Sequence, residues 1–533
     1  MKRLIHVGLC FILLLAIINC ARRGNPSGGP KDETPPVLIK ANPDTNTTNF
    51  KGKKIKLTFD EFVKLKDLQK QLIISPPSKL MPQIKPQGSA SKSIDIIIKD
   101  TLKENTTYVF NFGQSIVDNN EENPYPFFKY VFSTGDEIDS LSLSGVITDA
   151  VKKDAEQFVS VMLYEIDSTF TDSIIYKKPP TYITNTLDST TVFQLTNLRE
   201  GTYMLLALKD VGSNNLFNQQ SDKIGFISEL VTIPTDSLYT LNLFKEIPDY
   251  KASKPKLASK NRIIFGYRGN ADSMQIKMLT KAPDSLKYLV LKEPDKDTLN
   301  FWFTPFETDS INFLVTNEKV VDSFTVKIKD LYRDSLKINL VERQLRFNKP
   351  LEITSNMPID KINKDFITLL KSDSTAVDFK AELSTLENRL KLFWDIEPNQ
   401  RYLLNLYPEA ITDFYGNLND TLNYSLSSKS YAELGNISLA IKNVNSYPII
   451  VQLTDKKENV VAEKYIETPQ QSYDFKNLDP GNYFLRVIFD TNKNGIYDTG
   501  NYLLKIQPER IVYYPEAVEL RENWELKQEF ILK

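Results

Sequence analysis

Residues 490–502 read "DTNKNGIYDTGNY" and carry oxygen atoms at the spacing that a calcium-binding loop requires. Calcium prefers carboxylate, amide and main-chain oxygens, which a twelve-residue loop offers from alternate positions. The residues at positions 1, 3, 5, 7 and 9 are Asp490, Asn492, Asn494, Ile496 and Asp498. Gly495 takes the sharp turn at position 6, but Asn501 replaces the bidentate Glu that closes such loops. We predict these five residues as calcium ligands, and the alternative is a polar turn held by Asx hydrogen bonds.

The other side chains exclude several kinds of catalysis. The only histidine, His6, and one of the two cysteines, Cys10, lie in an apolar N-terminal segment that we expect to be removed. The remaining chain then has no imidazole, which excludes Ser-His-Asp and Cys-His arrangements and His/Cys zinc sites. Adjacent carboxylates such as Asp60 and Glu61 would point to opposite faces of a strand, so they are no ready acid/base pair. We predict a protein that is not an enzyme and requires no cofactor.

Aromatic rings offer a second kind of binding chemistry, because they stack on sugar rings when they are exposed. In "LNFWFTP", strand alternation would place Phe301 and Phe303 on one face and Trp302 on the other. Trp302 is therefore the predicted glycan-binding residue. The alternative is that Trp302 is buried, as sandwich aromatics commonly are.

The N-terminus predicts export and a lipid anchor. Lys2 and Arg3 precede "VGLCFILLLAII", an apolar run too short for a spanning helix, and Cys20 follows it closely. The segment resembles a bacterial lipoprotein signal peptide, residues 1–19, and that resemblance implies lipidation of Cys20 after cleavage. Residues 20–35 would then form a flexible tether. An ordinary secretory signal with an incidental cysteine is the alternative.

Composition and patterning predict an all-β protein without affinity for nucleic acid. Lys and Arg number 66 against 68 Asp and Glu, so the chain has no basic field that would attract nucleic acid. Short alternating segments follow the tether, and in "KIKLTF" they place Ile55, Leu57 and Phe59 on one buried face. At 533 residues the chain is several domains long. We predict a string of about five β-sandwich modules after the signal and the tether.

One internal repeat relates two of the predicted modules. "LTFDEF" at 57–62 reappears as "LRFNKP" at 345–350, and "NTTYVFNFGQSIVDNN" has a counterpart in "NQRYLLNLYPEAITDFYGN". Both copies resemble the bacterial Ig-like domain. The matching residues are Pro35, Pro36, Phe59, Asn105, Thr107, Tyr108, Phe347, Pro350, Asn399, Tyr402, Asp413, Gly416 and Asn417. The Ig-like modules predicted from this repeat are residues 36–138 and 341–428.

A second repeat is sharper. "LTNLREGTYMLLALKDVGSNNLFN" at 195–218 aligns without a gap on "FKNLDPGNYFLRVIFDTNKNGIYD" at 475–498. The shared "NL..G.Y.L" predicts a turn and then a strand, with Gly201 and Gly481 supplying the positive φ of the turn. The phrase resembles the prealbumin-like fold of carboxypeptidase regulatory domains. The modules predicted from this repeat are residues 141–247 and 433–533, and residues 254–340 form a β-module of unassigned family.

These resemblances imply an envelope protein. Triplets such as "DSL", residues 139–141, resemble the O-glycosylation sequon of Bacteroidota envelope proteins. The alternative is that Asp-Ser ends a loop and the apolar residue begins a strand. With the signal peptide and the Ig-like repeats, the chain resembles a Bacteroidota Ig-like-domain lipoprotein. We predict an outer-membrane lipoprotein, at the cell surface rather than on the periplasmic face, whose modules form a scaffold. Its expected partner is an outer-membrane β-barrel protein complex, such as the β-barrel assembly machinery. The alternative is a carbohydrate-binding surface lipoprotein of a glycan-uptake system.

Overall fold

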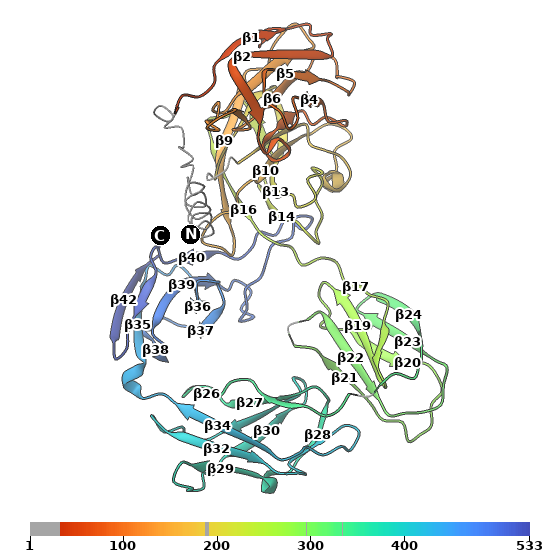
Figure 1. The fold of residues 1–533 in the computed structure, drawn as a ribbon, viewed down its shortest axis with the longest axis vertical. Helices are drawn as coiled ribbons and strands as arrows, with labels where there is room; N and C mark the ends of the chain where they lie inside the picture. Colours follow the sequence, from red (N-terminus) through yellow and green to blue (C-terminus); the bar gives the residue numbers. More distant parts are fainter. Residues whose placement is uncertain (1–31, 187–190, 295, 333, 533) are drawn as a thin grey trace, which may run out of the picture.

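The computed structural model describes residues 32–186, 191–294, 296–332 and 334–532. The predicted signal peptide, Cys20 and most of the tether lie outside these described residues. In the described part of the chain, strands β1 to β42 dominate, and the α-helix α2 (Leu68–Gln71) has four residues. Five groups of packed sheets follow one another along the chain, which confirms the predicted string of β-sandwich modules (Figure 1). We number them modules 1 to 5 in chain order.

Module 1 packs two sheets around one core. Its strands are β1 (Leu38–Asn42), β2 (Lys54–Leu65), β3 (Ile73–Ser75), β4 (Gln83–Lys85), β5 (Ser91–Ile97), β6 (Thr107–Asn111), β7 (Ile116–Asp118) and β8 (Lys129–Ser133). One sheet has the order β1-β2-β5-β4, with β7 beside β2, and the other has the order β3-β6-β8. Ile55, Leu57 and Phe59 of β2 are buried, as their alternation predicts.

Modules 2 and 5 share one topology. Module 2 contains β9 (Leu141–Asp149), β10 (Ser160–Glu165), β11 (Tyr182–Asn185), β12 (Val192–Leu198), β13 (Gly201–Lys209), β14 (Lys223–Phe226), β15 (Val231–Ile233) and β16 (Leu238–Leu243). Module 5 contains β35 (Gly435–Lys442), β36 (Ile449–Thr454), β37 (Val460–Ile466), β38 (Tyr473–Leu478), β39 (Gly481–Phe489), β40 (Ile511–Tyr513), β41 (Val518–Leu520) and β42 (Glu525–Ile531). In each, the first strand pairs in parallel with the last, and both second sheets have equivalent orders, β11-β10-β13-β14 and β37-β36-β39-β40. The sequence repeat is therefore a structural repeat.

The turn of this repeat differs from the sequence expectation. Asn197 and Asn477 adopt the positive φ, at 59° and 57°, whereas Gly201 and Gly481 do not. Asparagine tolerates the left-handed region better than most residues do. The Asn197 side chain also bonds the chain just before the first strand of module 2, since its Nδ2 donates to the carbonyl of Asp139 at 2.9 Å. The predicted role of the two glycines is wrong.

Modules 3 and 4 lie between modules 2 and 5 in the chain. Module 3 contains β17 (Lys251–Ala252), β18 (Lys256–Ser259), β19 (Arg262–Arg268), β20 (Gln275–Met278), β21 (Tyr288–Lys292), β22 (Thr298–Phe303), β23 (Ser310–Asn317) and β24 (Val320–Lys327). Module 4 contains β25 (Ile338–Leu340), β26 (Gln344–Leu345), β27 (Leu351–Ser355), β28 (Ile359–Ile362), β29 (Ile367–Lys371), β30 (Lys380–Ser384), β31 (Arg389–Phe393), β32 (Arg401–Leu406), β33 (Ile411–Asp413) and β34 (Leu422–Ser428). Three 3₁₀ turns lie in modules 2 and 4 and at the start of module 5: η1 (Asp172–Tyr176), η2 (Lys364–Phe366) and η3 (Tyr431–Glu433).

Modules 1 and 4 repeat one hydrogen bond. The hydroxyl of Tyr108 accepts the N–H of Lys103 at 2.8 Å, and the hydroxyl of Tyr402 accepts the N–H of Glu397 at 2.9 Å. Both tyrosines are buried and follow an asparagine with positive φ by three residues. The aligned "N..Y" phrases therefore build the same corner in both modules.

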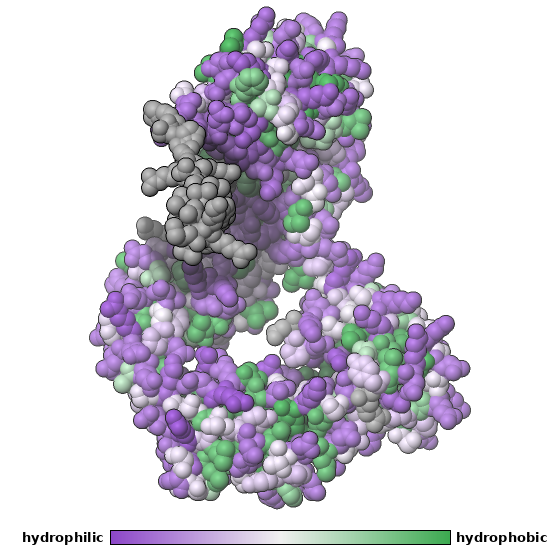
Figure 2. Space-filling model, viewed as in Figure 1, coloured by the Kyte–Doolittle hydropathy of each residue, from purple (hydrophilic) through white to green (hydrophobic). Residues whose placement is uncertain are grey.

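The chain turns back on itself. Module 1 lies at one end of the long axis beside module 2, and module 5 returns to the side of module 2 after modules 3 and 4 (Figure 1). The space-filling view shows an opening surrounded by modules 2 to 5 (Figure 2). The contacts that close this ring come from the loop after β39.

Candidate functional site

The loop after β39 is organised by Asp490. This residue is only 2% exposed, and its Oδ1 accepts the N–H groups of Lys493 at 2.7 Å and Asn494 at 3.2 Å. Its Oδ2 accepts the N–H of Gly495 at 2.8 Å. Gly495 has φ +79°, so it takes the sharp turn that its sequence position predicts. One carboxylate therefore satisfies three main-chain donors of the loop.

The other predicted ligands lie in the same loop. Asp498 Oδ2 accepts the side-chain amides of Asn492 and Asn494, each at 2.7 Å, whereas the Ile496 side chain is exposed. Across the described residues, no group of three or more His, Cys, Asp or Glu side chains is placed to hold a metal ion. The structure brings the five predicted residues together as a hydrogen-bonded turn. Calcium binding by this turn stays a prediction.

Sequence reasoning missed Glu509, which ties the two ends of the loop. Its Oε1 accepts the N–H of Thr491 at 2.6 Å and the Thr491 hydroxyl at 2.9 Å, and its Oε2 accepts the N–H of Asp498 at 3.1 Å. Glu509 is buried. No spacing rule places this residue at the loop, because it lies 11 positions beyond Asp498.

Beyond the calcium-like turn, residues 499–507 leave module 5 and pack on module 2. We call them the docking arm. Tyr502 is fully buried, and its ring meets that of Phe226 edge to face at 5.4 Å. The Tyr502 hydroxyl lies 2.9 Å from the sulfur of Met204 and donates to the carbonyl of Asp172 at 3.1 Å. This burial raises the pKa of the Tyr502 phenol.

Polar contacts surround the buried tyrosine. The N–H of Tyr502 donates to the buried Glu246 carboxylate at 2.5 Å, and Lys505 forms an ion pair with Asp172 at 2.5 Å. Further contacts between modules 5 and 2 join Thr499 to Lys245, Gln507 to Phe226, Arg486 to Val151, and Lys153 to Pro515. Modules 2 to 5 are thus closed into a ring by contacts between residues more than 250 positions apart.

Trp302 lies at the junction of modules 3 and 4. It is 4% exposed and forms one apolar cluster with Leu291 and Met357. The Arg262 guanidinium lies 5.0 Å from its ring centroid, and the ring of Tyr415 lies 6.5 Å away. The expected exposure of Trp302 is wrong, because module 4 covers this face of β22. Trp302 therefore joins two modules and offers no platform for a sugar.

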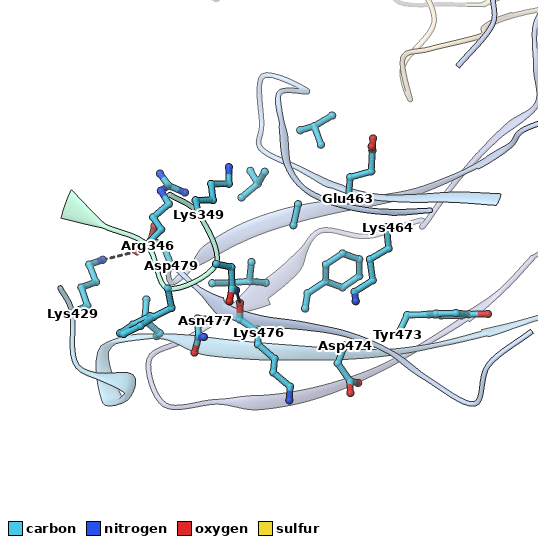
Figure 3. A pocket seen from close by; sticks show the side chains of 18 of the residues that line it. Arg346, Lys349, Lys429, Glu463, Lys464, Tyr473, Asp474, Lys476, Asn477 and Asp479 are labelled. Atoms are coloured by element: carbon cyan, nitrogen blue, oxygen red, sulfur yellow. Dashed lines mark hydrogen bonds and ion pairs between the residues drawn. The ribbon is translucent and has the colours of Figure 1, made fainter. Parts of the chain in front are cut away.

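A cleft of about 840 Å³ lies where module 4 meets module 5 (Figure 3). We call it the module 4–5 cleft. Strands β37 and β38 form two of its walls, and residues 344–349 of module 4 form the third. Val461, Phe475 and Leu478 provide apolar lining, and charged side chains surround it. Polar and charged side chains outnumber the apolar ones in this lining, so the cleft suits a ligand that carries charge.

Two contacts fix the end of this cleft. Lys429 forms an ion pair with Asp479 at 2.6 Å, and the rings of Phe347 and Tyr431 pack at 4.9 Å. Asn348 Nδ2 also donates to the carbonyl of Lys476 at 3.2 Å. The geometry of the cleft therefore depends on how module 4 is docked against module 5.

Two members of adjacent carboxylate pairs are bonded to the protein. Asp60, which precedes Glu61, accepts the N–H of Val37 through Oδ1 at 2.8 Å. Glu122, which follows Glu121, forms ion pairs with Lys64 at 2.7 Å and Lys66 at 2.6 Å, and these cations hold its pKa at about 2.

The fold defines a multidomain β-sandwich protein that contains an Ig-like domain. Residues 32–134 match the family model of the bacterial Ig-like domain. None of the curated proteins compared with the chain matches it. In the described part of the chain, no helix has the length and apolar character needed to cross a membrane.

Solved structures of other multidomain proteins resemble the chain weakly. Domains 1–6 of the surface layer protein SbsC are 12% identical with a TM-score of 0.15, over 92% of this chain and 68% of that one. The Bacillus anthracis TIE protein is 10% identical with a TM-score of 0.14, over 95% of this chain and 76% of that one. Titin domains A168–A170 are 12% identical with a TM-score of 0.14, over 52% of this chain and 97% of that one. Resemblances this weak carry no conclusion about function.

Proposed function

We propose that the protein is a lipid-anchored scaffold that holds a binding surface at fixed geometry for another protein of the cell envelope. The observation that carries this proposal is the closure of modules 2 to 5 by the docking arm, with Tyr502 fully buried against module 2. Modules joined only by linkers move relative to one another by default. A closed ring removes that freedom, which is useful to a protein that presents a surface and less so to a simple spacer.

The anchor in this proposal is Cys20, which holds the scaffold on the outer membrane through its lipid. Two or more acyl chains at one cysteine give stable anchoring, because each buried methylene contributes about 0.8 kcal/mol. We place the modules on the cell surface, since strings of Ig-like modules are commonly displayed there. Protease treatment of intact cells is expected to cleave the protein. Protection until the cells are lysed would contradict the surface location.

The proposed partner is an outer-membrane β-barrel protein complex, such as the β-barrel assembly machinery. The sandwiches offer sheet edges that can pair with strands of a partner. The carbohydrate-binding alternative has lost Trp302, the residue on which it depended.

Affinity purification from detergent-solubilised membranes, followed by mass spectrometry, tests the proposal. The wild-type protein should recover an outer-membrane β-barrel protein in stoichiometric amount. Tyr502→Ala, which opens the ring, should recover less of it, and Tyr502→Phe should serve as the matched control. Recovery of polysaccharide alone, or of no partner, would contradict the proposal.

Cys20→Ser tests the anchor separately. The variant should leave the membrane fraction and keep the β-sheet circular dichroism of the wild type. Retention after a high-salt wash would show that the lipid is not what holds the protein.

A further inference from the structure

The module 4–5 cleft contains a strand edge without a partner. In the described structure β37 pairs with β36 alone, and β38 pairs with β35 alone. Each strand therefore turns one row of main-chain N–H and C=O groups away from its sheet. Asn348 of module 4 already bonds the carbonyl of Lys476 on β38. The edge of β37 remains open along its seven residues, Val460–Ile466.

The apolar side chains of β37 also favour an added strand. Val460 lines the cleft and is 46% exposed, and Val461 beside it is half-buried against the module 5 core. Phe475 and Leu478 line the cleft from β38. A strand laid along β37 would cover these surfaces with the side chains of one face, while those of its other face pointed to the charged surroundings.

The carboxylates of the cleft are already bonded within the protein. Glu463 accepts the amide of Gln452 at 2.5 Å, and Asp474 accepts the hydroxyl of Ser438 at 2.7 Å. The third, Asp479, is held by Lys429. Each of the three acids therefore has a partner within the protein.

Two of the five cations of the cleft are paired, Lys429 with Asp479 and Arg346 with Glu342 at 2.9 Å. Five cations line it against three acids: Arg346, Lys349, Lys429, Lys464 and Lys476 against Glu463, Asp474 and Asp479. Among the residues drawn in Figure 3, no marked bond reaches the ammonium groups of Lys349 and Lys464. The Lys464 ammonium lies 5.8 Å from the ring centroid of Phe475, at the apolar lining. The excess of positive charge complements an anionic ligand.

We propose that the module 4–5 cleft binds an extended acidic peptide, which adds as a strand to the open edge of β37. Its main chain bonds to β37, its apolar side chains cover Val461 and Phe475, and its carboxylates meet Lys464 and Lys476. Seven paired residues span about 23 Å, at about 3.3 Å per residue. This proposal rests on the proposed scaffold function and specifies the kind of partner segment that the scaffold holds.

Fluorescence anisotropy with synthetic peptides tests the cleft directly. The protein is the full mature chain with Cys20→Ser. The probes are an eight-residue alternating Glu-Val peptide, the same peptide with Lys for Glu, and the Glu-Val peptide with alternate main-chain nitrogens methylated. We expect the first to bind at least tenfold more tightly than either of the others. Hydrogen exchange should slow at residues 460–466 when it binds.

Charge reversal locates the binding. The double substitution Lys464→Glu and Lys476→Glu should lower the affinity for the Glu-Val peptide at least tenfold. Lys456→Glu with Lys527→Glu makes the same charge change at exposed positions of module 5 outside the cleft, and it should leave the affinity within twofold. Circular dichroism and melting temperature check that both variants fold.

Three results would overturn the proposal: equal binding of the acidic and basic peptides, full binding of the methylated peptide, or equal competition by an oligogalacturonate, which would indicate a polyanion site. Other results distinguish this proposal from the proposed function. If the peptide binds but purification recovers no envelope protein, the cleft proposal is supported and the scaffold function is contradicted. If the Lys464→Glu/Lys476→Glu variant recovers as much envelope protein as the wild type, the scaffold function is supported and the cleft proposal is contradicted.

Discussion

The hydroxyl of Tyr502 lies 2.9 Å from the sulfur of Met204, although 298 positions separate the two residues in the chain. This pair joins the calcium-like loop region of module 5 to the core of its structural repeat, module 2. The segment that resembles a metal site thus leads directly into the contact that closes the ring.

Tyr502→Ala should open the ring without unfolding the modules. Removing a buried aromatic side chain costs about 3–5 kcal/mol, which here weakens the docking of module 5 on module 2. Small-angle X-ray scattering should show a larger radius of gyration. Tyr502→Phe, which removes only the hydroxyl, should cost about 1 kcal/mol and leave the radius nearly unchanged. A wild-type radius for the alanine variant would show that the arm does not hold the ring.

Trp302→Ala should destabilise the junction of modules 3 and 4 by about 3–5 kcal/mol, because it leaves a cavity beside Leu291 and Met357. Urea denaturation followed by circular dichroism measures the loss. The matched control is Trp524→Ala, at a tryptophan that is 43% exposed, which should change stability by about 0.5 kcal/mol or less. Equal effects of the two substitutions would contradict the burial of Trp302.

Asp490→Ala should destabilise module 5 even in EDTA, because the main-chain N–H groups of Lys493 and Gly495 lose their acceptor. We expect a loss of about 1–3 kcal/mol. Glu516→Ala, at an exposed position of the same module, is the control and should have almost no effect. A wild-type melting temperature for Asp490→Ala would contradict the structural role of this carboxylate.

The same melts test calcium. Millimolar calcium should raise the melting temperature of the wild type above its value in EDTA if the loop binds the ion, since a ligand of the native state stabilises it. Asp498→Ala should abolish that rise. An unchanged melting temperature of the wild type would exclude binding at this concentration.

Stability should fall at alkaline pH through buried tyrosines. Burial raises the pKa of Tyr130 and of Tyr483 to about 12, against about 10 in an unfolded chain. The folded state therefore favours the neutral phenol, and this contribution is complete below about pH 10 and is lost as the pH rises through about 12. The urea concentration at the midpoint of unfolding should not change up to about pH 9, and it should decline between about pH 10 and 12. Tyr130→Phe should reduce the decline, and an equal decline in this variant and the wild type would contradict the prediction.

Local patterns in the sequence were sufficient to predict the class of fold. The alternation of Ile55, Leu57 and Phe59 has the period of a strand, and it requires only that one face be buried. The repeats likewise predicted shared topology, because the same short phrases build the same corners, as at Tyr108 and Tyr402. Even so, the pattern could not distinguish which residue of the "NL..G" turn takes positive φ. That choice depends on the hydrogen bonds available to Asn197.

Strand alternation and turn residues act over a few positions, so the amino-acid sequence alone predicts a string of β-sandwiches. How the sandwiches meet is visible only in the folded protein: Trp302 is covered by module 4, Glu509 ties the calcium-like loop, and Tyr502 docks on module 2. These contacts join residues that lie far apart in the chain. An apolar side chain has the same local pattern whether it faces its own core or a neighbouring module, and the residues that bury Tyr502 lie more than 250 positions away.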